Sequence, residues 1–210
     1  MKVKKDLFLF RHGETDWNRE GRMQGGTDIP LNDTGREQAR CLRDFFTKHP
    51  VEIVYTSDLV RAKTTAEIAF EGLGTPLVIE PRLREVNLGD AESVLWEEAA
   101  AHFGHEITER WRSLDPAHSD FRFPNGESKR EHLDRLMSAL NDIVAQSPQT
   151  RIGISTHGAS MRRILHHFLP DVTEPIHVAN CVVYQATFES SKWSANRDPA
   201  FKLDSLKIWG

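Results

Sequence analysis

Cysteine is scarce in this chain, and charge of neither sign dominates. Its 210 residues include only two cysteines, Cys41 and Cys181, which are too few for a disulfide framework. The formal net charge of -4 gives no electrostatic reason to expect nucleic acid or an anionic membrane as a partner. We therefore expect any anion site to be local and to consist of a few basic side chains.

Long apolar runs are also missing. The first apolar run stops at Arg11, which is too short for the core of a signal peptide, and no later run is long enough to cross a membrane. With 39% hydrophobic and 28% charged residues, the composition is that of an ordinary globular protein. The sequence predicts a single domain over residues 1–210 and a cytoplasmic location.

Strand and helix signals alternate along the chain. Short apolar runs predict four buried strands, at 6–10, 51–56, 76–80 and 151–156. Apolar residues at helical spacing predict four helices, at 33–49, 59–70, 129–144 and 159–168. A serine and a glutamate three residues apart, Ser128 and Glu131, predict a capping box at the start of the third helix. This alternation predicts an α/β fold with a mostly parallel sheet.

Three other segments do not follow that alternation. Residues 19–32 are rich in glycine and predict a loop. Residues 86–127 mix aromatic residues with prolines and glycines, and predict an insertion of short helices and loops over one end of the sheet. In the tail, weak alternation predicts two further strands, at 181–188 and 201–209.

Polar side chains follow each of the four predicted parallel strands. In such sheets the ligand site lies outside the carboxyl ends of the strands. The residues found at those ends are Arg11 and His12, then Ser57, then Arg84 and Glu85, then His157. We expect these groups to converge on one pocket.

The residue types at these ends suit phosphoryl transfer. Arginine donates paired hydrogen bonds to phosphate, a role that Arg11 and Arg61 can fill, with Asn18 and the backbone around Gly25 as neutral donors. A neutral imidazole, His12, can attack phosphorus in line. His157 can stabilise the charge that grows in the transition state, and Glu85 is the best available acid for the leaving group.

The motifs resemble the histidine phosphatase superfamily, the phosphoglycerate mutase-like branch, over residues 7 to about 165. The matching segments, in the family's order, are Arg11–Thr15 with Asn18, Gln24–Gly25, Ser57–Leu59 with Arg61, Leu83–Glu85, Gly126–Ser128 and His157–Gly158. The resemblance implies a three-layer α/β/α fold and a phosphohistidine at His12, with no metal and no organic cofactor. It also implies a phosphate pocket completed by Arg11, Arg61 and His157, with Glu85 as proton donor.

Further candidates for substrate binding come from the same motifs: Gly13, Asn18, Gln24, Gly25, Arg84 and Gly158. Two departures from the family pattern bear on substrate. Members often carry a Gly-x-Trp-Glu-Gly stretch, but Ala91 and Ser93 replace its tryptophan and last glycine here, so we expect a differently packed pocket roof. The longer Arg-His-Tyr-Gly segment of true mutases is absent, which favours a phosphatase.

The leading hypothesis is a metal-independent phosphomonoesterase that acts on a small phosphorylated metabolite. Two alternatives stay open, a bisphosphoglycerate-dependent phosphoglycerate mutase and a module that binds a phosphorylated ligand without turnover. The aromatic residues of 86–127 either form a small core or line a pocket for an apolar leaving group. The oligomeric state also stays open, with a homodimer among the options.

Overall fold

The alternating side chains of β1 (Lys5–Arg11) divide the hydrophobic core into two halves. In the computed structural model, which describes residues 4–203, Leu7 and Leu9 point to one face of the sheet and Phe8 and Phe10 to the other. All four side chains are buried. A strand that is apolar on both faces belongs in the middle of a sheet covered on both sides, as the sequence predicts.

The sheet has the strand order β3-β2-β4-β1-β5-β6. The bounds of the other strands are β2 Ile53–Thr56, β3 Leu77–Ile79, β4 Arg151–Thr156, β5 Val183–Glu189 and β6 Lys192–Ala195. β1 to β4 are parallel to one another, while β5 pairs antiparallel with both β1 and β6. The sheet is thus mixed, with a parallel centre and an antiparallel hairpin at one edge.

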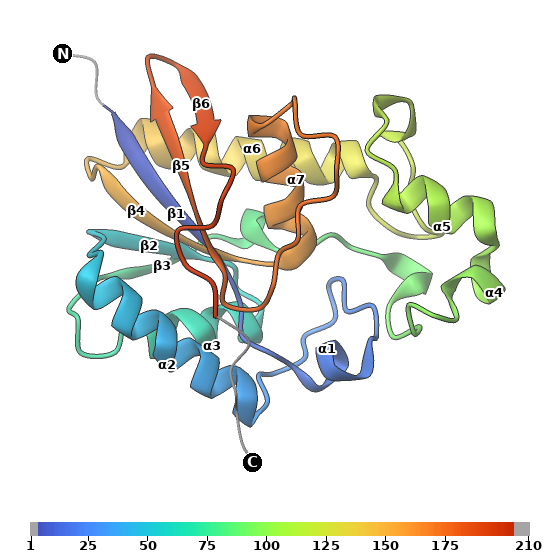
Figure 1. The fold of residues 1–210 in the computed structure, drawn as a ribbon, viewed down its shortest axis with the longest axis horizontal. Coiled ribbons are helices and arrows are strands. Elements are labelled where there is room, and N and C mark those ends of the chain that lie inside the picture. Colours follow the sequence, from blue (N-terminus) through green and yellow to red (C-terminus); the bar gives the residue numbers. More distant parts are fainter. Residues whose placement is uncertain (1–3, 204–210) are drawn as a thin grey trace.

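Helices cover both faces of this sheet (Figure 1). The longer helices are α2 (Asp33–Lys48), α3 (Val60–Ala69), α6 (Lys129–Gln146) and α7 (Gly158–Phe168). α6 and α7 pack with Leu7 and Leu9, whereas α2 and α3 pack with Phe8 and Phe10. The predicted three-layer α/β/α architecture is confirmed, and so is the capping box at Ser128 and Glu131.

The structure differs from the sequence-based prediction near both ends of the chain. A short helix, α1 (Asp16–Glu20), extends into the predicted loop at 19–32 because Thr15 and Asn18 form a second capping box. The last strand among the described residues is β6, at 192–195. Of the strand predicted at 201–209, Phe201 makes an isolated bridge to Val183, and residues 204–209 lie outside the described range. The hairpin between β5 and β6 was not predicted because two serines with positive φ form its turn, without the usual Asn-Gly signal.

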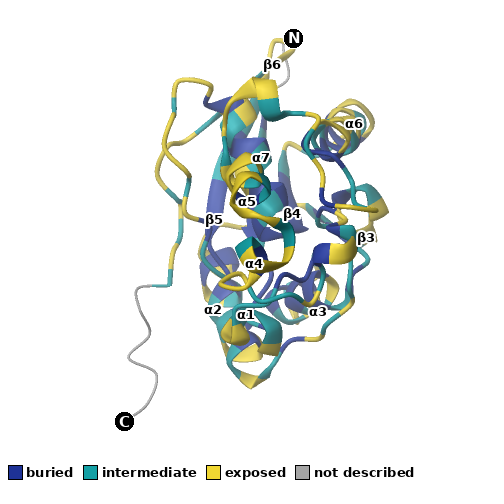
Figure 2. Ribbon diagram, turned by 90° about the vertical axis from the view of Figure 1, so that its right-hand side faces the viewer, coloured by how far each residue is buried: buried dark blue, intermediate teal, exposed yellow. Residues whose placement is uncertain are grey.

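The segment 86–127 forms short elements beside the sheet. They are two helices, α4 (Ala99–Phe103) and α5 (His105–Arg112), and two 3-10 turns, η2 (Gly89–Ala91) and η3 (Pro116–His118). A further turn, η1 (Pro81–Leu83), precedes the segment. Much of the surface of α4 and α5 is exposed (Figure 2).

The aromatic residues of this segment form a small core of their own. Phe123 is buried, and Trp111 and Phe121 pack against it together with Met23 of the preceding loop. Trp96 lies apart and is 37% exposed. The packing favours the core interpretation of these aromatic residues over a ligand pocket. Within residues 4–203, no helix has the length and apolar character that a membrane span needs.

Ser93, which replaces the family's glycine, has a left-handed backbone with φ of 73°. Such a conformation costs a residue with a Cβ about 1–2 kcal/mol, and glycine adopts it without that cost. We expect Ser93→Gly to raise the free energy of unfolding by about 1 kcal/mol in urea titrations. Ser93→Ala, which keeps the Cβ, is the control and should give no gain; an equal gain from both variants would contradict this explanation.

Candidate active site

Two buried histidines face each other at the carboxyl ends of β1 and β4. His12 directly follows β1 and His157 directly follows β4, and their ring centroids lie 5.2 Å apart. The parallel hydrogen-bond pattern continues past both strands, since His12 N donates to Thr156 O at 3.1 Å. The expected convergence of strand ends therefore holds for these two residues.

A backbone carbonyl sets the tautomer of His12. Its Nδ1 lies 2.7 Å from Gly13 O, and because a carbonyl can only accept, Nδ1 must carry the proton. The lone pair is then on Nε2. Gly13 N in turn donates to Thr65 Oγ1 at 3.0 Å, and a Cβ on Gly13 would lie 2.3 Å from Gly35 O. Only glycine fits this turn, which fixes the imidazole.

Arg61 is fully buried and is held by carbonyls of the loop before α2. Its guanidinium donates to Gly25 O at 2.8 Å and Thr27 O at 2.7 Å. Glu92 fixes that loop by accepting from Gly26 N at 2.7 Å and from the Thr27 hydroxyl. A Cβ on Gly25 would lie 2.3 Å from Glu92 Oε1, so glycine is required there as well.

Three buried nitrogens of this cluster have no hydrogen-bond partner within the described residues. They are Arg11 Nε, Arg61 Nε and His157 Nδ1. Other nitrogens of these side chains do have partners. Arg11 Nη1 donates to Val178 O at 2.8 Å, and His157 Nε2 lies 2.9 Å from Ser57 Oγ. A native fold rarely leaves buried polar atoms unpaired, so these three suit a ligand rich in acceptor oxygens.

Glu85 reaches the same region from the loop after η1. Its carboxylate accepts from the backbone N–H groups of Ala159 and Ser160, both at 2.9 Å, at the N-terminus of α7. That position suits an anion because the helix dipole and the free N–H groups favour negative charge. Burial lowers the pKa of Arg11 and Arg61, and the negative charge of Glu85 partly offsets that lowering at both guanidiniums.

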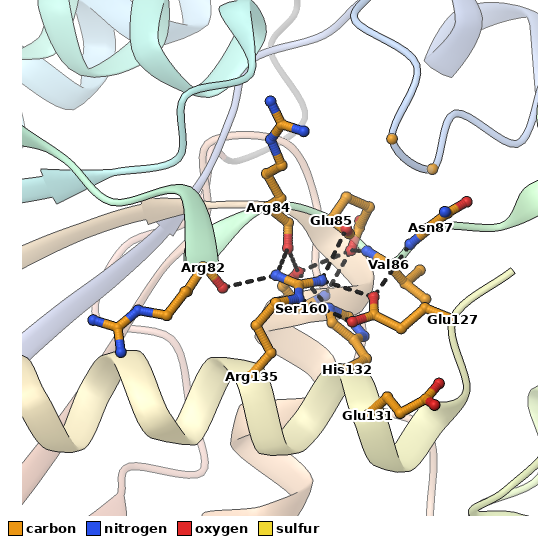
Figure 3. A network of polar contacts seen from close by, with 12 residues as sticks. Arg82, Arg84, Glu85, Val86, Asn87, Glu127, Glu131, His132, Arg135 and Ser160 are labelled. Atoms are coloured by element: carbon orange, nitrogen blue, oxygen red, sulfur yellow. Dashed lines mark hydrogen bonds and ion pairs between the residues drawn. The ribbon is translucent and has the colours of Figure 1, made fainter.

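Arg135 of α6 holds the backbone on either side of Glu85 (Figure 3). It donates to the carbonyls of Arg82, Arg84 and Glu85 at 2.8–3.3 Å. Its other edge pairs with the Glu127 carboxylate at 2.7 and 2.9 Å. Sequence reasoning missed Arg135, whose only signal is a charged residue on an otherwise amphipathic helix.

The remaining candidates surround this centre. Asn18 accepts from Asn180 Nδ2 at 3.2 Å, and the same amide donates to His12 O at 3.0 Å. Gln24 is buried. A Cβ on Gly158 would lie 3.2 Å from Arg11 Nε. Asn180 was not predicted, because it follows no strand-end motif.

Arg84 differs from the other candidates, because a carboxylate already pairs with it. It makes two hydrogen bonds to Asp58, at 2.6 and 2.7 Å, on a partly exposed rim. A cavity of about 500 Å³ lies beside this rim, lined by Gly26, Pro81, Arg84, Glu85, Asn87, Glu92, Glu127 and Arg135. Six of these eight lining residues have charged or amide side chains.

Burial and the neighbouring cations set the charge state of the two histidines. Desolvation, with Arg61 and Arg11 close by, lowers the pKa of His12 well below its ordinary value of 6.5. The same causes lower the pKa of His157. Burial also lowers the pKa of Arg11, to about 10. At neutral pH both imidazoles are neutral and both guanidiniums are charged.

Comparison with known proteins identifies the family. The model of the histidine phosphatase superfamily (branch 1) matches residues 7–198, and the chain belongs to this family. It is 35% identical over 188 residues to the Bacillus subtilis protein named uncharacterized phosphatase PhoE, covering 88% of this chain and 89% of that one. It is 33% identical over 194 residues to the Cronobacter sakazakii protein named probable phosphoglycerate mutase GpmB, covering 90% and 88%.

A solved structure agrees with this assignment. The mycobacterial glucosyl-3-phosphoglycerate phosphatase, described in complex with VO3, superposes with a TM-score of 0.79 at 25% identity, covering 91% of this chain and 97% of that chain. The resemblance inferred from the motifs and the phosphoglycerate mutase-like fold are thus confirmed.

The depressed histidine pKa values predict an acid-sensitive fold. His12, His132 and His157 stay neutral in the folded protein, whereas the unfolded chain binds a proton at each below about pH 6.5. Stability therefore falls as the pH drops, by up to about 1.4 kcal/mol per pH unit for each histidine. Urea unfolding at pH 7.0 and 5.5, above the range of most carboxyl groups, measures this slope.

A variant tests the origin of that slope. His166 also has a pKa lowered by burial, so His12→Asn removes one of four titrating histidines while it keeps a donor for Gly13 O. The slope should fall by about a quarter to a third. The buffer must be free of phosphate, because an anion bound only by the folded state stabilises it. Equal stability at both pH values would contradict neutral burial of these histidines.

Proposed function

We propose that the protein is a metal-independent phosphomonoesterase that works through a phosphohistidine on His12. The observation that carries the proposal is the group of unpaired, buried nitrogens on Arg11, Arg61 and His157 beside the free Nε2 of His12. A phosphate dianion offers oxygens to all three nitrogens while its phosphorus faces Nε2. Membership of the histidine phosphatase superfamily supports this assignment.

In the first step His12 Nε2 attacks phosphorus and the bond from phosphorus to the ester oxygen breaks. Glu85 gives its proton to that oxygen, so an alcohol leaves and the phosphoryl group stays on His12. Arg11, Arg61 and His157 stabilise the charge on the outer oxygens. The low pKa of His12 keeps its lone pair available at neutral pH.

In the second step water attacks phosphorus from the side that the alcohol has left. Glu85, now a carboxylate, takes a proton from the water as the phosphorus–nitrogen bond breaks. Inorganic phosphate leaves, and both His12 and Glu85 return to their starting states. Every proton and phosphoryl transfer in the two steps is accounted for by the pocket residues and water.

The substrate that fits best is a small phosphorylated metabolite with a polar leaving group. The support is the set of charged and amide side chains that line the cavity beside Glu85, among them Asn87, Glu127, Arg84 and Arg135. The similar mycobacterial structure is named for a substrate of this kind, a glucosylated phosphoglycerate. We extend this class of substrate to the present chain as a proposal.

Phosphoglycerate mutase is the second candidate, because several relatives carry that name. A mutase needs the phosphoryl group to return to a second hydroxyl before water reaches it. An assay for conversion of 3-phosphoglycerate to 2-phosphoglycerate, with a bisphosphoglycerate primer, separates the two. We expect release of inorganic phosphate to exceed conversion.

The direct experiment measures hydrolysis of p-nitrophenyl phosphate in the presence of EDTA. We expect turnover by the wild-type protein and a loss of about a thousandfold or more in His12→Asn, which cannot form the covalent intermediate. His167→Asn, the same substitution at an exposed position of α7, serves as the matched control and should keep the wild-type rate. Turnover that His12→Asn retains, or that EDTA abolishes, would contradict the proposal.

A further inference from the structure

His132 is a fully buried histidine that the proposed reaction does not use. It lies on α6 with 0% exposure, on the helix face that carries Leu136 and Leu140 into the core. Its Nε2 lies 3.0 Å from Ser160 Oγ in the first turn of α7. Because burying an imidazole costs desolvation energy, an apolar residue would suit this core position better unless the contact has a use.

Ser160 connects His132 to the proposed acid. Its Oγ lies 2.9 Å from Glu85 Oε1 and 3.1 Å from Arg84 O, and the hydroxyl has one proton to donate (Figure 3). If His132 Nε2–H donates to Oγ, the hydroxyl proton is free to point at the shorter contact, Oε1. A donor behind the hydroxyl also polarises it and strengthens that bond.

The two oxygens of Glu85 consequently have different surroundings. Oε1 accepts hydrogen bonds from Ser160 N, Ser160 Oγ and Val86 N at 2.9–3.1 Å, whereas among residues 4–203 Oε2 accepts one only from Ala159 N. An oxygen that already accepts three hydrogen bonds is a poor place for a proton. The proton that reaches the leaving group therefore resides on Oε2.

We propose that His132 and Ser160 are positioning residues for Glu85, which keep Oε1 as a permanent acceptor and leave Oε2 to carry the transferred proton. The inference rests on the proposed function, because it acts through the acid of that reaction. Neither residue touches the substrate. Their contribution is the orientation and protonation site of one carboxyl group.

The charged groups around the pair agree with this role. Arg135 on α6 and Arg163 on α7 face His132, and with burial they lower its pKa well below the ordinary value. His132 is thus neutral and has one N–H to donate. Glu85 faces Arg11 of β1, Arg61 of α3 and Arg163 of α7. None of these arginines takes part in the contacts that join His132, Ser160 and the Glu85 carboxylate.

The test compares a good and a poor leaving group. For Ser160→Ala we expect kcat to fall about tenfold with β-glycerophosphate and less than about twofold with p-nitrophenyl phosphate, whose leaving group needs little protonation. Glu85→Gln, which lacks the acid, gives the largest expected difference between the losses of kcat on the two esters. The alkaline limb of the kcat profile should also move to higher pH in Ser160→Ala, because the carboxylate loses a donor.

Two substitutions at His132 refine the test. His132→Leu, like Ser160→Ala, should lower kcat more for β-glycerophosphate than for p-nitrophenyl phosphate. His132→Gln should keep most of the activity on both esters, because its amide N–H can donate to Ser160 Oγ. Leu136→Ala is the matched control, one turn along the same buried helix face. We expect it to lower stability and leave the ratio of the two kcat values unchanged.

The outcomes separate this inference from the proposed function. Equal losses on both esters in Ser160→Ala, or no loss on either, would overturn the positioning role even where hydrolysis still depends on His12. That result counts whether or not His132→Leu folds. Absence of His12-dependent hydrolysis in the wild-type protein would contradict the proposed function and the inference together.

Discussion

The burial of Arg61 and of the Arg11 Nε atom beside a neutral histidine is the constraint on which the rest of the structure depends. Arg61 is fully buried, and its Nε, like that of Arg11, has no hydrogen-bond partner among the described residues. The carboxylates that act on Arg61 are those of Glu85, Asp28 and Glu92. Buried cations are unfavourable unless they are paired, so this arrangement of donors is preorganised for a dianion. The same cations keep His12 neutral, which is the state that a nucleophile needs.

The fold holds this cluster mainly with backbone atoms. Carbonyls of Gly25 and Thr27 orient Arg61, the carbonyl of Gly13 orients His12, and N–H groups of α7 orient Glu85. Backbone groups move less than side chains do, so a site built from them loses little energy to rearrangement. This explains why glycine is required at Gly13 and Gly25, where the chain packs too closely for a Cβ.

Much of the architecture and the centre of the site could be predicted from the sequence, for a physical reason. Strands such as 151–156 are continuous apolar runs, and their carboxyl ends meet at one edge, so the residues after them had to lie together. The roles assigned to them, including the substrate contacts of Gln24 and Arg84, stay predictions. The pairing of Arg84 with Asp58 shows how a rim residue gains a partner that a linear motif does not reveal.

What could not be predicted depends on contacts between segments that lie far apart in the chain. The site is contacted by Asn180, Arg135 and Ser160, which the sequence motifs did not include. Asn180 donates to the carbonyl of His12, 168 positions away, and no local periodicity encodes such a contact. His132 carried a signal, a histidine on the apolar face of an amphipathic helix, yet a core histidine is as often structural as functional. The β5–β6 turn was missed because its serines adopt positive φ without the usual sequence cue.

The central claim, that His12 Nε2 bonds the phosphorus of a bound ester, is tested most directly by trapping the intermediate. Wild-type protein is mixed with substrate, quenched by denaturation at alkaline pH, where phosphohistidine survives, and analysed by peptide mass spectrometry. The account predicts one added phosphoryl group on the peptide that contains His12, which acid removes. A phosphoryl group on another residue, or turnover with none on His12 under rapid quenching, would contradict it.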